Sequence, residues 1–463
     1  MAEDALNICL LSYRGHPQSG GQGVYLRLLS RELVNMGHRV SVWSGQPYPE
    51  LFDDVELVKI PGLDLWNEGA LLRIPTLEEL RDPLNVYEWV RTRLGEFAEP
   101  RAFCQRVARS FRQANGSLDF DVVHDNQSLG LGLLELQKRV PVVATIHHPI
   151  TVDRRVALRA ERRPTKLYGL WRWYHFLPMQ LKVARQLDRI LTISDASTDD
   201  IEREFKLDRR RMRNVGNGIN LDVFKPLEGY TRNPNRLITT LSHDVPLKGF
   251  SFLLDAVAQL RRERPELELL VIGGNVPRER TLAKIEKLGL QKVVRFRGRV
   301  PAEQIAREYA EAIVAVVPSV YEGFGFPAGE AMACEVPVVS TTGGALPEVV
   351  GTDGKAATLV EPRSPEALAA AIRDLLEATP ERRAEMGRAG RDRVLGNFTW
   401  RRAAERTVDC YREIIDERRS SQPDAPRRTW VEVGTGAEQG ADTTEDGTTG
   451  IAARTGNQSL GTC

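Results

Sequence analysis

The residues most able to do chemistry lie in one short stretch, PSVYEGFGFPAGEAMACEVP, at 318–337. Glu322 and Glu330 bracket a Gly-Phe-Gly-Phe loop, and Pro327 follows it at a position typical of the start of a helix. Glycines allow a ligand to approach the backbone, and the free amides of a helix start attract an anion such as a diphosphate. We place Glu330 in the first helical turn, where its carboxylate can accept hydrogen bonds from the two hydroxyls of a ribose. The alternative is that both carboxylates only complement the helix dipole, which explains one glutamate better than two.

Three histidines, His124, His147 and His148, fall at the carboxyl ends of apolar runs that predict parallel strands. Open α/β sheets bind ligands at this edge, so these imidazoles are candidates for a site. A zinc site could combine them with Asp125, but they lack the spacing typical of zinc ligands. The glycines of SGGQGVY, at 19–25, could belong to a dinucleotide site, but G-x-G-x-x-G is absent.

Two sheets are needed to position these residues. Apolar runs alternate with helical stretches along the chain, which is the pattern of a doubly wound parallel sheet. We predict strands at 7–12, 38–43, 121–124, 141–146 and 189–193, and then at 237–241, 267–272, 293–296, 313–318 and 336–340. Asn220–Pro234, with two prolines and little periodicity, is predicted to be the linker. The predicted fold class is therefore α/β, with two Rossmann-like domains.

Composition excludes several classes of protein. The chain has 463 residues, of which 41% are hydrophobic and 27% charged, as in ordinary globular proteins with more than one domain. A net charge of +1 gives no field that attracts nucleic acid, and five scattered cysteines argue against a disulfide framework. The N-terminus does not resemble a signal peptide and no run of about 18 apolar residues occurs, so we expect a cytoplasmic protein. We expect a disordered tail over 419–463.

Two stretches interrupt the alternation of strands and helices. Leu63–Ala114 carries Trp66, Trp89 and Phe97 among charged residues and is predicted to be helical, whereas Arg154–Gln186 is rich in arginine and aromatic residues. The interpretation we favour is that these helices bury their aromatic side chains and leave their arginines in water. The alternative is a peripheral contact with the inner membrane face, because interleaved Arg and Trp suit anionic headgroups.

With these features in view, the chain resembles the retaining glycosyltransferases of family 4, which have the GT-B fold. Their hallmark is a Glu, seven residues and a second Glu, and EGFGFPAGE at Glu322–Glu330 matches it throughout. The resemblance runs from about Asn7 to Ile415. Its other pieces, in order, are SGGQGVY, VVATIHH, TISDAS, NGIN-x-x-VFKP, PLKG, TTGGALPEVV and NFTWRRAAERTVDCY.

The resemblance implies two domains that face each other across a cleft. The acceptor-side domain would span 1–225 and be completed by a closing helix at about 400–418, and the nucleotide-sugar donor domain would span 226–399. The implied reaction transfers a sugar, with retention, from a nucleotide-diphosphate sugar to a glycan, lipid or small molecule. We expect no cofactor and no metal, because no D-x-D motif sits at a strand end and a lysine with a helix start can neutralise the leaving diphosphate.

The resemblance also implies roles for particular residues. Lys248 would pair with the donor diphosphate, Glu330 would hold the ribose, and Glu322 would contact the transferred sugar. His147 would lie beside the reacting sugar, and it forms the predicted catalytic set with Glu322 and Lys248. The other predicted donor-binding residues are Gly20 and Gly21 across the cleft, Gly323, Phe324 and Gly325 through their amides, and Arg297 and Val300 beside the nucleobase.

Two positions depart from the family's pattern. The family usually has an arginine five residues before the lysine of PLKG, where this chain has His243, which we still place at the donor. Its imidazole carries at most part of a positive charge at neutral pH. Asn126 stands where a second histidine often follows, so the usual acceptor contacts are in question there.

Two other functions stay open on the sequence. A sugar-nucleotide epimerase of the same shape would need an acid–base set, and such enzymes lack the Glu–loop–Glu pattern. A non-catalytic, sugar-nucleotide-binding protein is disfavoured by the presence of Lys248, His147 and both glutamates, although His243 favours it slightly. Turnover, binding without turnover and interconversion of the free donor distinguish the three.

Overall fold

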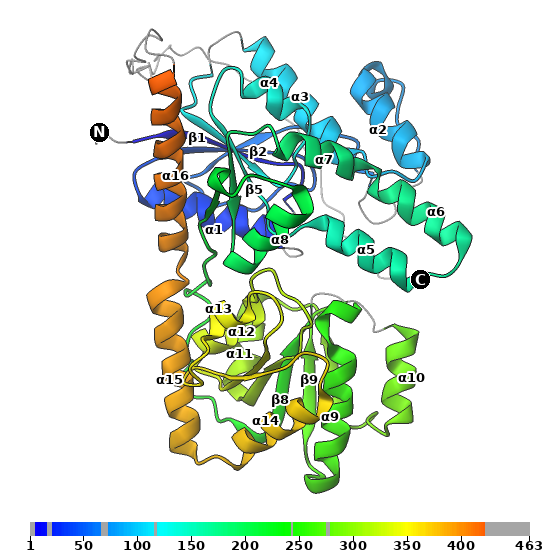
Figure 1. The fold of residues 1–463 in the computed structure, drawn as a ribbon, viewed down its shortest axis with the longest axis vertical. Helices are drawn as coiled ribbons and strands as arrows, with labels where there is room; N and C mark the ends of the chain where they lie inside the picture. Colours follow the sequence, from blue (N-terminus) through cyan, green and yellow to red (C-terminus); the bar gives the residue numbers. More distant parts are fainter. Residues whose placement is uncertain are drawn as a thin grey trace, which may run out of the picture. The chain divides into compact units, whose positions relative to one another are not determined.

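The protein is described from a computed structural model, which covers residues 5–15, 21–65, 73–114, 118–241, 244–274 and 278–421. Residues Met1–Ser421 form one compact unit. Within it the described chain forms two sheets in which the strands run parallel and helices pack on the faces (Figure 1). This confirms the predicted α/β class. The predicted division at 225/226 falls inside the unit and stays a prediction.

The first sheet has the strand order β3-β2-β1-β4-β5-β6-β7. Alternate residues of one strand point to opposite faces, so Cys9 and Leu11 enter one core and Ile8 and Leu10 enter the other. The order reverses between β1 and β4, and open sheets bind ligands beyond the strand ends at such a switch point. The strands are β1 (Asn7–Ser12), β2 (Arg39–Ser44), β3 (Glu56–Lys59), β4 (Val122–Asn126), β5 (Val142–Thr145), β6 (Arg189–Thr192) and β7 (Met212–Asn214).

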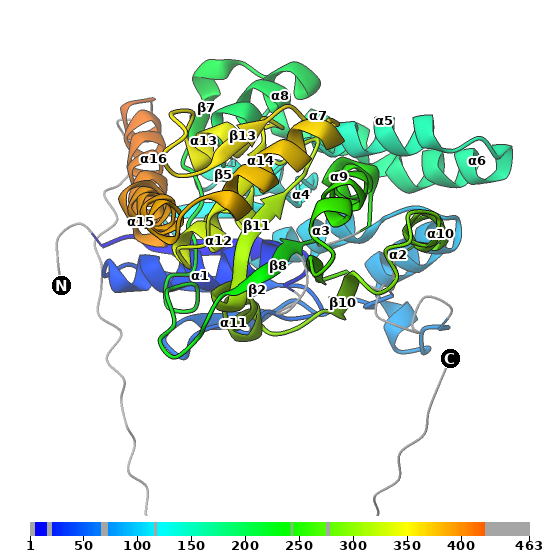
Figure 2. The ribbon, with the colours of Figure 1, turned by 90° about the horizontal axis from the view of Figure 1, so that it is seen from below.

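The helices of this half include those of the two stretches that interrupt the alternation. They are α1 (Gly21–Asn35), η1 (Glu79–Arg81), α2 (Pro83–Arg93), α3 (Glu99–Gln113), α4 (Gly132–Leu136), α5 (Ile150–Ala160), α6 (Pro164–Trp173), η2 (Tyr174–Phe176), α7 (Leu177–Ala184), α8 (Asp195–Phe205) and η3 (Arg209–Arg211). Figure 2 shows α5 and α6 side by side. The expected helices in the described parts of 63–114 and 154–186 are thus confirmed.

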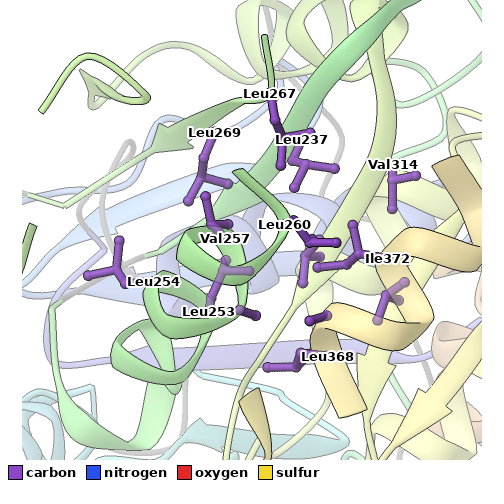
Figure 3. Packing of buried hydrophobic residues seen from close by; sticks show 14 of the residues in the cluster. Leu237, Leu253, Leu254, Val257, Leu260, Leu267, Leu269, Val314, Leu368 and Ile372 are labelled. Carbon is purple, nitrogen blue, oxygen red and sulfur yellow. The ribbon is translucent and has the colours of Figure 1, made fainter. Parts of the chain in front are cut away.

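The second sheet has the order β10-β9-β8-β11-β12-β13. One of its cores brings Leu237 of β8 against Leu253 and Leu260 of α9 and Ile372 of α14 (Figure 3). Its elements are β8 (Asn233–Thr240), η4 (Pro246–Lys248), α9 (Phe250–Glu263), β9 (Glu268–Ile272), α10 (Glu279–Lys287), β10 (Val294–Gly298), α11 (Ala302–Glu311), β11 (Ala312–Val317), α12 (Phe326–Ala333), β12 (Val338–Thr341), α13 (Leu346–Val350), β13 (Thr358–Val360), α14 (Pro365–Glu377) and α15 (Pro380–Asn397).

The last helix, α16 (Trp400–Ser421), follows the second half in sequence but packs on the first. Trp400 and Tyr411 lie in one buried cluster with Tyr25 and Leu29 of α1. The helix continues past Arg419, so the expectation that disorder begins there is wrong for 419–421. Its last turn carries Arg418 and Arg419, cations that favour the negative end of the helix dipole. The rest of the expected tail lies outside the described residues.

Two other expectations about the elements need correction. The strands β3, β7 and β13 were not predicted, because each has only three or four residues at or near a sheet edge. The linker ends before Pro234, because β8 begins at Asn233. A register shift against β11, between the pairs at Asn233 and Leu237, allows a proline near the start of this central strand.

The aromatic residues of 154–186 divide between core and surface. Trp173 stacks on Phe97 with ring centroids 5.2 Å apart, as a packing role predicts. However, Tyr168 is 63% exposed and Trp171 is 52% exposed, so the packing interpretation is wrong for them. Trp66 lies outside the described residues. Among the residues that are described, no helix is long and apolar enough to cross a membrane.

Candidate active site

Lys248 is positioned by a tight loop against the end of β11. Gly249 has φ +65°, and a Cβ there would lie 1.8 Å from the carbonyl oxygen of Pro318. Only glycine therefore lets the two segments approach this closely. The amide of Val320 also donates to the carbonyl of Leu247 at 2.8 Å. This contact brings the lysine loop beside the loop that carries the first glutamate.

Lys248 and Glu322, which are 74 residues apart, form an ion pair at the centre of the site. Lys248 Nζ donates to both carboxylate oxygens, at 2.8 and 2.9 Å. The hydroxyl of Ser319 donates to Oε1 of the same carboxylate at 2.7 Å. Glu322 is buried, so its charge needs these partners. Two of the three predicted catalytic residues are thus in direct contact.

The loop between the two glutamates turns sharply into α12. Gly325 has φ +104°, and a Cβ there would lie 2.7 Å from the side chain of Leu346. The carbonyl of Glu322 accepts the amide of Ala345 at 2.9 Å. The Phe324 ring is buried against Phe326 and Phe398, so this residue can reach a ligand only through its backbone. The aromatic side chains hold the loop to the core, and the contact of its amides with a donor stays a prediction.

Glu330 is the fifth residue of α12, one residue beyond the expected first turn, because the helix already begins at Phe326. Burial raises the pKa of its carboxyl group to about 7. Within the described part of the chain, no ion pair or hydrogen bond to the carboxylate of Glu330 is found. Tyr309 lies close by, and its hydroxyl donates to the carbonyl of Pro327 at 3.2 Å. A desolvated carboxylate without a cation is suited to accept hydrogen bonds from neutral hydroxyls.

His147 is held as a neutral imidazole of defined tautomer. Its Nε2 lies 2.7 Å from Asn126 Oδ1, while Asn126 Nδ2 donates to the carbonyl of Gln22 at 3.3 Å. Since the amide oxygen can only accept, Nε2 carries the proton and Nδ1 keeps a lone pair. Burial, and next the charge on His148, lowers the pKa of His147 to about 3. The ring is therefore neutral at physiological pH, and Nδ1 can accept a hydrogen bond from a hydroxyl.

The glycine loop and the histidine strand end meet directly. A Cβ on Gly323 would lie 3.0 Å from the carbonyl oxygen of His147. The hydroxyls of Ser194 and Ser197 both donate to the carbonyl of Gly323, at 2.7 and 2.8 Å. Beside them, the carboxylate of Glu348 accepts the amides of residues 195 and 196, at 2.8 and 2.7 Å. The TISDAS segment of the first half therefore holds the glycine loop of the second.

The other predicted donor-binding residues lie apart from this centre or outside the described residues. Arg297, at the end of β10, is half-exposed and pairs with Glu308 of α11. Val300 packs at the margin of a core cluster. Gly21 is the first residue of α1, next to the Gln22 carbonyl that Asn126 contacts. Gly20 and His243 lie outside the described residues.

Several residues of the site were missed or given no role from the sequence. Asn126 appeared only as a departure from the family, yet it fixes the tautomer of His147. Ser319 could have been suspected, since it lies three residues before Glu322. Ser194 and Ser197 stand in the TISDAS motif, but nothing in the motif indicates that the partner is a backbone carbonyl. Glu348 stands in the TTGGALPEVV motif, but nothing in that motif indicates that its carboxylate accepts backbone amides at the start of α8.

The three histidines at the strand ends form hydrogen bonds with different partners. His124 lies between Tyr411 and Thr145, His147 contacts Asn126, and His148 contacts Asp153 at 2.8 Å. The described residues contain no group of three or more His, Cys, Asp or Glu side chains that could hold a metal ion. The imidazoles thus do not converge on one ligand position.

Comparison with known proteins identifies the class. The profile described as "Glycosyltransferase Family 4" matches residues 19–223, and that described as "Glycosyl transferases group 1" matches residues 230–393. The chain is 45% identical over 412 residues to "MMP alpha-(1->4)-mannosyltransferase" of Mycolicibacterium hassiacum, covering 89% of this chain and 98% of the relative. It is 34% identical over 220 residues to "GDP-mannose-dependent alpha-(1-6)-phosphatidylinositol monomannoside mannosyltransferase" of Mycolicibacterium smegmatis, covering 44% and 56% of the two chains.

Solved structures agree on the fold. Sucrose-phosphate synthase of Thermosynechococcus elongatus superposes with a TM-score of 0.66 at 24% identity, covering 89% of this chain and 100% of the other. Anabaena HepE in complex with UDP and glucose gives a TM-score of 0.60 at 18% identity, with 90% and 100% covered. This chain belongs to the family 4 glycosyltransferases of the GT-B fold. It is a glycosyltransferase, and the resemblance seen in its sequence is confirmed.

Proposed function

We propose that this glycosyltransferase moves mannose from GDP-mannose to a hydroxyl of a mannoside acceptor, with retention of configuration and without a metal ion. The observation that carries the proposal is the 45% identity, over 98% of its length, to a relative named as an alpha-(1->4)-mannosyltransferase. The name of a second relative includes GDP-mannose dependence, which supports the choice of nucleotide.

We assign the neutralisation of the negative charge on the leaving GDP to Lys248 and to the start of α12. Lys248 Nζ already has a carboxylate partner at 2.8 Å, so its charge is held in place before the donor binds. The amides after Gly325 add the positive end of a helix dipole. Preorganised charge of this kind stabilises a developing oxyanion without reorganisation during the reaction. Glu330, with no other partner among the described residues, is assigned to the ribose hydroxyls.

The transfer itself is assigned to the space between His147 and the glycine loop. The bond from the anomeric carbon to phosphate oxygen breaks, and the acceptor hydroxyl bonds to that carbon from the same face. The departing phosphate oxygen takes the hydroxyl proton, so no protein nucleophile is needed. Neutral His147, with its Nδ1 lone pair, can orient a sugar hydroxyl there. Glu322 would contact the transferred sugar while it restrains Lys248.

The test is a panel of nucleotide sugars with and without short α-mannosides. GDP-mannose should raise the melting temperature, since a ligand at about 100 times its dissociation constant adds roughly 2.7 kcal/mol. Release of GDP should then require the acceptor. Turnover of UDP-glucose or ADP-glucose in place of GDP-mannose would overturn the choice of donor. Binding without turnover would favour a binding protein, and interconversion of the free donor would favour an epimerase.

A further inference from the structure

A chain of buried hydrogen bonds runs from α16 to the strand ends of the first sheet. The Tyr411 hydroxyl lies 2.5 Å from His124 Nδ1, and His124 Nε2 lies 2.6 Å from Thr145 Oγ1. Thr145 Oγ1 in turn lies 3.0 Å from the Tyr25 hydroxyl. None of the four residues is more than 3% exposed. A buried polar chain whose members are all bonded specifies a single arrangement of its side chains.

The imidazole of His124 links the two ends of this chain of hydrogen bonds. Burial lowers the pKa of His124 to about 3, so one ring nitrogen donates and the other accepts. The donors can run from Tyr411 toward Tyr25 or from Tyr25 toward Tyr411, and in either order all three contacts are hydrogen bonds.

Tyr25 joins this chain to His147. Its ring packs edge to face on the His147 imidazole, with centroids 4.8 Å apart and planes at 82°. It also contacts Trp400, the first residue of α16, at 5.6 Å. The imidazole is therefore held by its hydrogen bond to Asn126 on one side and by the Tyr25 ring on another. The position of that ring depends on both ends of the chain of hydrogen bonds.

We propose that Tyr411 and Tyr25 are positioning residues for the transfer: through His124 and Thr145, the docked helix α16 holds the His147 imidazole in the orientation that the reaction uses. The inference rests on the role proposed for His147 above. It means that α16, whose Tyr411 is 287 residues from His124 in the sequence, contributes to catalysis as well as to folding.

The experiment uses the full chain with ¹⁵N-labelled histidine. In the wild type, the imidazole ¹⁵N resonances should show His147 neutral with its proton on Nε2. Tyr411→Phe removes one hydroxyl and keeps the ring, and it should shift the His147 resonances and lower kcat about tenfold, with the KM for the donor within about twofold. Tyr25→Phe, at the other end of the chain, should have the same two effects and serves if Tyr411→Phe folds poorly.

Val408→Ala is the matched control, since Val408 is buried in the same cluster on α16 and makes no side-chain hydrogen bond. It should lower the melting temperature but leave the His147 resonances and kcat close to wild type. Unchanged His147 resonances in both tyrosine variants, or equal shifts in Val408→Ala, would overturn the proposal. If no sugar donor is turned over, the proposed function fails, while the resonances still decide whether the tyrosines position His147.

Discussion

Lys248 and Glu322 illustrate how a single ion pair can prepare a site for an anionic substrate. The carboxylate is buried and the ammonium is about one-fifth exposed, so the lysine cannot swing freely into solvent. The free-energy cost of immobilising the lysine side chain is incurred during folding, before any donor binds. In the proposed role, Lys248 would meet the donor diphosphate while its charge is already shared with Glu322.

Removing the lysine tests this role. We expect Lys248→Met to lower kcat by roughly 10²–10³-fold, the usual effect of losing one preorganised group that stabilises developing charge. Lys284→Met is the matched control, because Lys284 forms a similar pair with Asp255 at 2.6 Å on α9. Steady-state kinetics should show a loss only for the first variant. A comparable loss in both would mean that Lys248 acts through stability.

Metal independence follows from the same assignment. If Lys248 and the start of α12 neutralise the leaving group, turnover should survive saturating EDTA. Initial rates measured before and after chelation, with and without added Mg²⁺ or Mn²⁺, check this. Activity that disappears with EDTA and returns with either metal would show that the charge is neutralised differently.

Glu330 should make donor binding depend on pH. Its pKa of about 7 in the folded protein lies above the ordinary value, so the native state holds more protons than the unfolded state between about pH 4.5 and 7. The favourable contribution of Glu330 to the free energy of unfolding is thus present at low pH and lost as the pH rises through 7. Donor binding needs the carboxylate, so affinity should fall below pH 7, and binding at pH 7 should release about half a proton.

Calorimetry in buffers of different ionisation enthalpy measures that proton release. Glu330→Gln should abolish it, and Glu330→Ala should weaken donor binding by about 1.5–3 kcal/mol, the scale of hydrogen bonds to a charged group. Donor affinity that is unchanged in the alanine variant would remove Glu330 from the ribose site.

Local spacing was enough to predict part of this site. Glu322 and Glu330 are eight residues apart, on one loop and the helix that follows it, so the sequence alone predicts that they belong to one site. The partners of Glu322 and His124 could not be predicted, since Lys248 is 74 residues away and Tyr411 is 287 residues away. Only the packing of the sheets and of α16 brings these pairs into contact.

Among the helices and strands, the buried central strands could be predicted from the sequence, and the short strands at the sheet edges could not. The central strands β1, β5 and β11 are buried on both faces and appear in the sequence as mainly apolar runs. The edge strand β3 has only four residues, with two partly buried ones between two exposed ones. Such a short segment has no pattern that distinguishes it from a loop.

The pair α5–α6 carries a local excess of positive charge. Residues 150–173 contain seven basic and two acidic residues, against a net charge of +1 for the whole chain. Within the described part, Arg154, Arg162 and Arg163 form no ion pair, and Tyr168 and Trp171 are exposed. Arginines beside exposed aromatic rings suit the interface of an anionic membrane, where each cation contributes about 1 kcal/mol.

We therefore expect the protein to co-sediment with vesicles rich in anionic phospholipid at low salt and to dissociate at high salt. Reversing the charge at Arg154, Arg162 and Arg163 should abolish the binding and leave donor turnover intact. Arg155 is kept, because it pairs with Glu204 at 2.5 Å. If the wild type never sediments with vesicles at any salt concentration, these arginines serve solubility and the acceptor is not presented on a membrane.

At the scale of the molecule, the donor loop and the acceptor-side strands depend on contacts made late in the chain. Gly323 is bonded to Ser194 and Ser197 across the two halves, and α16 carries Tyr411 back to the first sheet. The family's motifs predicted these segments in the right order, but not the atoms that join them. The candidate active site is thus a property of the whole described unit rather than of either sheet.

The most direct test of the account is the anomeric configuration of the first product. Full-length protein is incubated with GDP-mannose and a short α-mannoside, and the new anomeric proton is followed by ¹H NMR from the earliest turnover. Because GDP-mannose carries an α-linked sugar and transfer is proposed to occur on the same face, the account predicts an α-linked mannosyl product and one GDP released per linkage. A β-linked product, or GDP released with free mannose as the only sugar product, would contradict it.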